Sequence, residues 1–227
     1  MYSGSGFSDW EIGDITVLVH EGVYHLFHLI IPNHDYIAHA TSLDGISWKR
    51  VNNALFVGNP GEWDDDMLWT MDVCQASDKF EMYYTGLQRR DRGVISRIGL
   101  AESANLVDWK KSRKKIFPLE PKGIYYETKN TNPRKWLSFR DPFRYEYKGE
   151  VYLLLCARSI TGPVSRRGCV GIVNITNDIV ELMPPLLYPM MYDDIEFHCV
   201  FELVGRYFVM GAIRQELKLR TCVAQCF

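Results

Sequence analysis

The sequence has no long hydrophobic run and little net charge. No stretch of about 18 apolar residues occurs in its 227 residues, so no membrane-spanning helix is expected. The 26 Lys and Arg nearly balance the 28 Asp and Glu, and the net charge of −2 gives no reason to expect binding to nucleic acid or to a membrane surface. Residues 1–13 lack a basic segment followed by an apolar one, so no signal peptide is expected there.

The spacing of the cysteines excludes a common class of metal site. The six cysteines form no Cys-x-x-Cys pair, and no Cys/His spacing resembles a zinc site. Several of them lie in apolar runs and are expected to be buried free thiols, which favours a cytoplasmic location. We therefore expect no metal and no cofactor.

Apolar and aromatic side chains are abundant. The chain is 47% hydrophobic and 13% aromatic, which is typical of a globular protein, and we expect one domain spanning residues 1–227. Tyr and Trp line sugar-binding sites, but they also fill the cores of β proteins, and the core is the default interpretation.

The main pattern is a diverged repeat. Each copy is an apolar strand, a polar turn and a second, aromatic-rich strand, which is the signature of a β-hairpin. Three of the turns contain glycine, at Gly22, Gly149 and Gly205. The four copies cover residues 14–28, 72–85, 141–157 and 196–210.

A second repeated element follows the first two hairpins. Residues 37–49 and 98–110 both read as an apolar strand, a Ser, a turn and a Trp-Lys pair, and residues 168–173 play the same part less clearly. Two hairpins per repeat make a four-stranded sheet, which is one blade of a β-propeller. The alternative is a generic antiparallel sandwich, and the doubled Ser-turn-Trp-Lys element argues against it. The stretch 111–135 is basic and aperiodic and is expected to be a loop.

All four predicted strand heads carry a carboxylate, namely Asp14, Asp72, Asp141 and Glu196. The tripeptide Arg140-Asp141-Pro142 and the order of these carboxylates resemble the five-bladed β-propeller glycosidases, above all glycoside hydrolase family 32, with family 43 as the second choice. The resemblance runs from about Trp10 to Ala212. It implies an all-β propeller fold.

The resemblance also implies roles for the carboxylates. Asp14 takes the position of the nucleophile, Asp141 that of the transition-state stabiliser and Glu196 that of the acid/base. Cleavage of a glycosidic bond needs a proton donor and a second carboxylate, which fits this set. Asp193 and Asp194 are expected to raise the pKa of Glu196 if they lie close to it. The Asn, Pro, Asn and Gly that surround the nucleophile in family 32 are missing around Asp14.

A second group of residues is expected to bind the substrate: Trp69, Asp72, Arg140, Arg158 and His198. Trp69 either stacks on a sugar face or belongs to the core, and Asp72 either binds sugar or caps a turn. Arg140 is expected to orient the carboxylates or grip a substrate anion. His198 shares a strand face with Glu196, because side chains alternate along a strand.

Five blades of about 60 residues would need about 300 residues. We therefore expect about four blades here, with the C-terminal blade or blades missing, and the activity of such a chain is open.

Several functions remain open from the sequence. The leading hypothesis is a hydrolase of furanosides, fructoside-like, acting on a small-molecule or oligosaccharide substrate. The alternatives are an inverting arabinosidase or xylosidase of the family 43 kind, a glycoside phosphorylase with Arg140, Arg158, Arg166 or Arg167 as phosphate ligands, a non-catalytic carbohydrate-binding propeller, and an interaction scaffold. The sequence leaves a homo-oligomer open.

Overall fold

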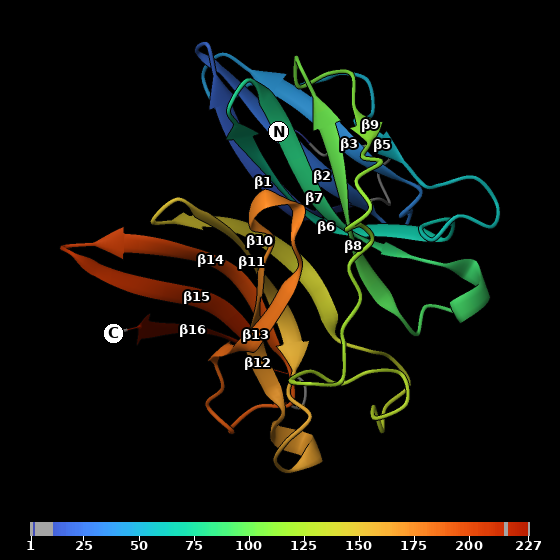
Figure 1. Ribbon diagram of the computed structural model, residues 1–227. Helices are drawn as coiled ribbons and strands as arrows, with labels where there is room; N and C mark the ends of the chain where they lie inside the picture. The colour runs from blue at the N-terminus through green and yellow to red at the C-terminus, as the bar shows by residue number, and fades with distance from the viewer. Residues whose placement is uncertain (1, 3–10, 216–217, 227) are drawn as a thin grey trace. The chain divides into compact units, whose positions relative to one another are not determined.

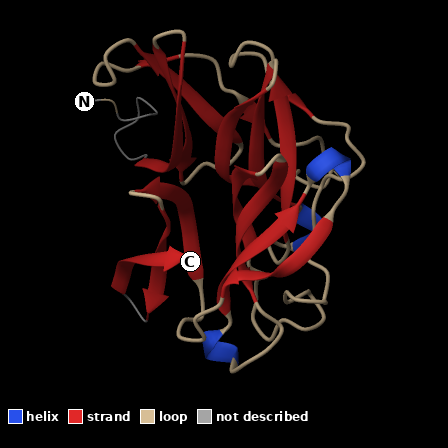
Figure 2. Ribbon diagram, turned by 60° about the vertical axis from the view of Figure 1, so that its left-hand side comes forward, coloured by secondary structure: helices blue, strands red, loops and turns tan. Residues whose placement is uncertain are grey.

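The structure is a computed structural model that describes residues 2, 11–215 and 218–226. The side chains of Phe197, His198 and residues 214–226 lie outside the description. Within these limits the secondary structure is almost wholly β, as Figures 1 and 2 show. The helical segments of the described residues are three single 3₁₀ turns, Arg89–Asp91, Val164–Arg166 and Thr176–Asp178. The all-β prediction is thus confirmed.

The strands form four antiparallel sheets, each made from strands that follow one another in the chain. The first contains β1 (Glu11–His20), β2 (Val23–Ile31), β3 (Tyr36–Ser42) and β4 (Lys49–Arg50), and β5 (Leu55–Phe56) pairs with β3. The second contains β6 (Met67–Ala76), β7 (Lys79–Leu87), β8 (Ser96–Ser103) and β9 (Lys110–Lys111). The four hairpins predicted from the repeat correspond to the first two strands of each sheet.

The third sheet contains β10 (Phe139–Tyr147), β11 (Glu150–Arg158), β12 (Gly168–Asn174) and β13 (Glu181–Leu187). The fourth contains β14 (Ile195–Leu203), β15 (Arg206–Gln215) and β16 (Lys218–Cys226), three strands within the described residues. Four strands in sequence order are the topology of a propeller blade, so the predicted strand–turn–strand units add up to sheets of the expected kind.

Three of the hairpin turns share one backbone conformation. Glu21 (φ 49°) precedes Gly22 (φ 79°), Lys148 (φ 53°) precedes Gly149 (φ 82°), and Val204 (φ 53°) precedes Gly205 (φ 67°). Two central residues with positive φ match the twist of the flanking strands, and glycine adopts this region without steric cost. The turn glycines noted in the sequence therefore have a local conformational reason.

The repeated Ser-turn-Trp-Lys element folds in the same way in both copies. Asp44 Oδ1 accepts hydrogen bonds from the backbone N–H of Ile46 (2.8 Å) and Ser47 (2.7 Å). Asn105 Oδ1 accepts from Val107 (3.0 Å) and Asp108 (2.9 Å) in the second copy. The backbone donors, led by Ser47, hold the pKa of Asp44 well below its usual range. These turns join β3 to β4 and β8 to β9, as the repeat predicted.

The chain divides into two compact units, residues 1–93 with 97–118 and residues 94–96 with 119–227. In the first unit the cores of the first two sheets pack together through side chains such as Phe27, Ile37, Leu68, Met82 and Tyr84. In the second unit Leu154 and Val170 of the third sheet pack on Ile195, Val209 and Ile213 of the fourth.

The stretch 112–138 contains no regular strand, as predicted, but its middle is firmly attached to the second unit. Tyr126 is fully buried, donates a hydrogen bond to Met183 O (2.7 Å) and accepts one from Ile172 N–H (2.9 Å). Glu127 N–H donates to Arg158 O (2.8 Å). The segment therefore crosses sheet three as a fixed strap rather than as a free loop.

Candidate functional site

The predicted catalytic residues fall in both units. Asp14 lies on β1 of the first unit, whereas Asp141 on β10 and Glu196 on β14 belong to the second. The two groups are therefore described separately.

The first strand of every sheet contains a register shift near its start. The shifts lie between Ile12 and Ile15 in β1, Trp69 and Met71 in β6, Arg140 and Phe143 in β10, and Phe197 and Cys199 in β14. A bulge bends a strand and redirects one side chain, and bulges are common beside active sites. The carboxylates Asp14 and Asp141 both lie inside such bulges.

The repeat assigned Asp72 to the head of the second copy, and the structure corrects this position. Asp72 pairs with Tyr83 in the middle of β6, two residues beyond the bulge. Thr70 occupies the bulge instead. The cause is that β6 begins at Met67, earlier than the apolar run had indicated. Sugar binding by Asp72 stays a prediction.

In the first unit, the exposed Asp14 has a defined neighbour. Thr70 Oγ1 donates a hydrogen bond to Asp14 Oδ2, so that two bulge residues from adjacent sheets meet. Trp69 precedes Thr70 and lies beside His34, with ring centroids 6.3 Å apart. Thr70 was not singled out in the sequence; its position between the predicted sugar contacts Trp69 and Asp72 was the available signal.

In the second unit, Arg140 connects the two predicted carboxylates. Its side chain is 10% exposed, and its guanidinium lies 3.3 Å (Nε) from Asp141 Oδ2 and 3.5 Å (Nη2) from Glu196 Oε1. Both carboxylates therefore contact one cation. Orienting these groups is one of the two roles expected for Arg140, and it stays a prediction.

Asp141 itself has an unusual backbone. Its φ of 56° is in the left-handed region, which non-glycine residues seldom adopt, and it stands immediately before the buried Pro142. Asp141 is 9% exposed, so its carboxylate is largely shielded from water. Positive φ also occurs at turn residues of this chain such as Lys148 and Val204, whereas Asp141 lies inside a strand, at the bulge of β10.

Arg140 also binds a third carboxylate, which the sequence had assigned differently. Arg140 Nη2 donates to Asp194 Oδ2 (2.8 Å), and Arg158 Nη2 lies 3.4 Å from the same oxygen. Burial raises the pKa of Asp194, but the charges of Arg140 and Arg158 outweigh it, and the pKa is lowered overall. Asp194 was expected to act on Glu196 as a neighbouring charge; the structure shows it paired with two arginines.

Arg158 is fully buried, so its guanidinium supports other side chains. Its Nε donates to Asp193 O (3.0 Å), its Nη2 lies 3.6 Å from Asp193 Oδ2, and its guanidinium carbon lies 5.8 Å from the centre of the Trp136 ring. Direct sugar binding by Arg158, as predicted, is not supported by this burial. Trp136 is 44% exposed.

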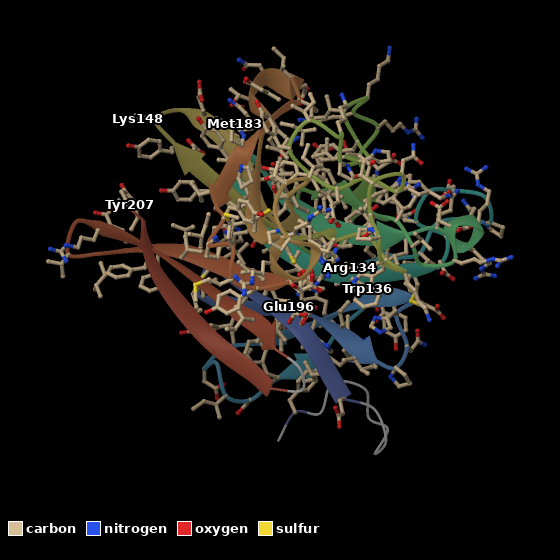
Figure 3. All side chains as sticks on the ribbon, turned by 90° about the horizontal axis from the view of Figure 1, so that it is seen from below. Arg134, Trp136, Lys148, Met183, Glu196 and Tyr207 are labelled. Atoms are coloured by element: carbon tan, nitrogen blue, oxygen red, sulfur yellow. The ribbon has the colours of Figure 1, made fainter. Side chains whose placement is uncertain are left out.

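An outer layer of charges surrounds this group. Glu127 is fully buried and pairs with Arg134 (3.3 Å) and Arg167 (2.9 Å), and Arg134 also pairs with Asp193. In Figure 3, Arg134 and Trp136 are on the same side of the second unit as Glu196, away from Lys148 and Tyr207 near the hairpin turns. The strap thus brings an arginine to the residue that precedes Asp194.

We call the residues of both layers the Arg140 cluster. It contains four arginines and five carboxylates joined by ion pairs: Arg134, Arg140, Arg158 and Arg167 with Glu127, Asp141, Asp193, Asp194 and Glu196. With four arginines and five carboxylates, its formal charge is negative.

Glu196 is the most exposed of the three carboxylates that contact Arg140. Its side chain is 27% exposed, compared with 6% for Asp194 and 11% for Asp141. The side chain of His198, a predicted substrate ligand on the same strand, lies outside the described residues.

Among the described residues, no group of three or more His, Cys, Asp or Glu is arranged to hold a metal ion. No helix in the described part of the chain is long and apolar enough to cross a membrane.

Residues 14–165, more than half of the chain, match the N-terminal domain of glycosyl hydrolases family 32. The chain belongs to this family. The match includes Asp14 and the Arg140-Asp141-Pro142 tripeptide, and ends before Glu196. No curated protein matches the chain in sequence.

Solved structures of related glycosidases share the fold of this family 32 chain. The family 32 β-fructofuranosidase of Bombyx mori has a TM-score of 0.69 at 18% identity, over 94% of this chain and 46% of that one. Fructan 1-exohydrolase IIa of Cichorium intybus has a TM-score of 0.69 at 18% identity, over 93% and 41%. A thermostable family 43 glycoside hydrolase has a TM-score of 0.70 at 18% identity, over 99% and 72%.

These likenesses establish the fold class, which is a β-propeller of the glycosidase type with four blade-like sheets in this chain. The chain spans less than half the length of the Bombyx and Cichorium enzymes. The predicted fold class and the predicted family are both confirmed.

Proposed function

We propose that this chain carries the catalytic carboxylates of a glycoside hydrolase that cleaves a furanoside, fructoside-like, by a double-carboxylate mechanism. The observation that carries the proposal is Arg140, which contacts Asp141 and Glu196 together inside a family 32 chain. Hydrolysis of a glycoside requires two carboxyl groups with different tasks, and a shared cation is one means to set their charges.

In this proposal Glu196 is the acid/base, because it is the most exposed carboxylate of the Arg140 cluster among those that Arg140 touches. Asp141 stabilises the transition state through substrate hydroxyls. Asp14 is the nucleophile, or the base that activates water, and Thr70 holds its carboxylate in one orientation. Trp69 and His198 remain the proposed contacts to the sugar.

The substrate is proposed to be a small neutral sugar. The solved neighbours with similar folds include a β-fructofuranosidase and a fructan exohydrolase, and a mutant of the Bombyx enzyme was solved in complex with sucrose. The negative charge of the Arg140 cluster also fits an uncharged sugar better than an anionic one. The phosphorylase alternative is also disfavoured, because two of the arginines proposed as phosphate ligands, Arg158 and Arg167, are paired with carboxylates.

The family 43 alternative differs in stereochemistry. A retaining enzyme uses Asp14 as nucleophile, whereas an inverting one uses it as base. Proton NMR of the first-formed product separates the two, since a retaining enzyme releases the same anomer as the substrate.

A non-catalytic carbohydrate-binding protein is the second candidate. The residues that surround the family 32 nucleophile are absent around Asp14, which lies in the sequence Gly13-Asp14-Ile15-Thr16.

The cytoplasmic location and a homo-oligomer stay predictions.

The test is hydrolysis of sucrose and of a panel of aryl furanosides and pyranosides. We expect turnover of at least one furanoside by the native protein, and a loss of kcat by a factor on the order of 10³ or more in Asp14→Asn and in Glu196→Gln. The matched control is Asp78→Asn, an exposed turn residue between β6 and β7, which should retain full activity. Sugar binding without hydrolysis, unchanged in Glu196→Gln, would establish the binding-protein alternative.

A further inference from the structure

The Arg140 guanidinium has a separate partner at each of its nitrogens. Nη1 donates to Ser138 Oγ (2.6 Å), Nη2 donates to Asp194 Oδ2 (2.8 Å), and Nε lies 3.3 Å from Asp141 Oδ2. Ser138 Oγ in turn donates to Asp194 Oδ1 (3.0 Å), which closes a ring of hydrogen bonds through Arg140, Ser138 and Asp194. A planar guanidinium held at three points has little freedom to rotate.

We propose that Asp194, paired with Arg158, is a positioning residue that fixes the Arg140 guanidinium between Asp141 and Glu196. The inference rests on the proposed function, because it concerns how the two catalytic carboxylates of the second unit are oriented. The side chain of Asp194 is only 6% exposed, so it is largely shielded from solvent.

The geometry explains why Asp194 needs Arg158. A buried carboxylate is stable in its charged form only when it is paired and hydrogen-bonded. Asp194 has Arg140 on one side at 2.8 Å and Arg158 at 3.4 Å, and its Oδ1 accepts hydrogen bonds from Ser138 Oγ (3.0 Å) and from the buried thiol of Cys156 (3.5 Å). Without Arg158, Asp194 would share one cation with Asp141 and Glu196.

Arg158 is in turn held in place by the backbone of Asp193. It is fully buried, its Nε donates to Asp193 O (3.0 Å), and two of its nitrogens, Nη1 and Nη2, make no hydrogen bond among the described residues. An arginine that forgoes such bonds contributes mainly through its charge, and the carboxylates nearest to it are Asp194 and Asp193.

The backbone at Asp194 is also constrained. Gly168 N–H donates to Tyr192 O (2.8 Å), and a Cβ placed on Gly168 would lie 2.9 Å from Asp194 Cα. β12 therefore approaches the start of β14 so closely that only glycine fits. The position of Asp194 is set by this backbone contact as well as by its side chain.

The charges predict opposite effects for two substitutions. Asp194→Asn removes a negative charge beside Arg140, so the acid carboxyl beside that arginine releases its proton more readily. Arg158→Gln removes a positive charge and has the reverse effect. A residue that merely supports the fold would not move the pH dependence in opposite directions.

The experiment measures kcat, KM and their pH profiles on the best aryl furanoside. We expect Asp194→Asn to lower kcat by roughly 10- to 100-fold with KM changed less than about threefold, since misplacement of a catalytic group affects the reacting step. The alkaline limb of its kcat profile should move to lower pH, and that of Arg158→Gln to higher pH.

The matched control is Asp193→Asn, which alters the neighbouring residue and its contacts to Arg134 and Arg158 but no contact of Arg140. Its alkaline limb should stay in place. An Asp194→Asn enzyme with native kcat and a native pH profile would overturn the inference, and so would limbs that move in the same direction in both variants. If Asp194→Asn does not fold, Ser138→Ala replaces it: it opens the hydrogen-bond ring without removing a charge and should lower kcat with KM nearly unchanged, whereas native kcat would overturn the inference.

A second measurement separates this inference from the proposed function. In ¹⁵N NMR of labelled arginine side chains, the Nη signals of Arg140 should show hindered rotation in the native protein and faster rotation in Asp194→Asn or, failing that, Ser138→Ala. If the native protein hydrolyses no glycoside but the rotation changes as expected, the proposed function fails while the pairing stands. Active protein in which Arg140 rotates freely overturns the pairing alone.

Discussion

At the scale of single residues, Arg140 is the most informative side chain. In the sequence it is one part of a family tripeptide; in the structure it contacts Ser138, Asp141, Asp194 and Glu196 at once. Burial disfavours its charge, but Cys156, Asp141 and Asp194 act in the opposite direction and raise its pKa well above the usual range. Arg140 therefore keeps its charge at any pH relevant to a glycosidase.

A second group of buried ionisable residues lies in the first unit. His25 Nδ1 and His39 Nε2 are 3.0 Å apart, and the His39 ring stacks on Phe27. His39 Nδ1 is buried without a hydrogen-bond partner, so the neutral form of His39 with Nδ1 unprotonated is favoured. Burial, reinforced by His25, Arg50 and His28, lowers the pKa of His39 to about 4.

We therefore expect acid to destabilise the first unit. The folded pKa of His39 lies below the unfolded one, so its neutral form contributes fully above about pH 6.5 and the contribution is lost as the pH falls toward about 4. The loss should be on the order of 2–3 kcal/mol, measured as the free energy of unfolding between pH 7 and pH 4.5. The variant His39→Gln should flatten this dependence, whereas His20→Gln, a partly exposed control, should not. An equally steep dependence in His39→Gln would contradict the assignment.

At the scale of elements, each sheet combines a tight turn at one end with a bulge at the other. The turns Glu21-Gly22, Lys148-Gly149 and Val204-Gly205 set the register of three hairpins. The bulges then shift that register at the strand starts, where Asp14 and Asp141 lie. The turn fixes the register of each hairpin, and the bulge shifts that register near the start of the strand. Together they decide on which face of the sheet the side chains at the strand start lie.

The turn conformation makes a prediction for Gly149. Its φ is 82° and no atom lies near the position of a Cβ, so Gly149→Ala should cost about 1 kcal/mol of unfolding free energy through backbone strain alone. Denaturant unfolding checks this. The matched control is Gly123→Ala in the same unit, where the φ is not positive and the Cβ would make an ordinary contact at 3.6 Å, so little change is expected. Equal costs at the two positions would show that strain is not the cause.

At the scale of the whole molecule, the chain contains two compact units, each with its own buried core. The sequence predicted one domain over residues 1–227, and that stays a prediction. The question is one of cooperativity: one domain unfolds as a whole, whereas independent units unfold separately.

Leu154→Ala tests it. Leu154 is 1% exposed in the core of the second unit, and its truncation should cost about 2–5 kcal/mol. For a single domain, hydrogen exchange should speed up in the slowest amides of both units and calorimetry should show one transition at lower temperature. Faster exchange confined to residues 119–227, or two transitions, would contradict the single-domain prediction. Leu203→Ala, at 57% exposure, is the control and should change little.

Much of the fold was readable from the sequence because its signals are local. Turn glycines, strand-length apolar runs and the Ser-turn-Trp-Lys element each specify structure within about fifteen residues, so the hairpins and their order were predicted correctly. The limits of β6 were not, because its first residues carry no distinct local pattern and their pairing with β7 decides where the strand begins.

What the sequence by itself determined is therefore the all-β fold, the four hairpins, the family and the carboxylates that mark it. Only the tertiary structure decided that Thr70 contacts Asp14, that Asp194 is paired with two arginines, and that Arg158 is buried. The physical reason is distance along the chain. Arg140 and Asp194 are 54 residues apart, and a contact between them depends on how sheets three and four pack. No local sequence pattern indicates this packing.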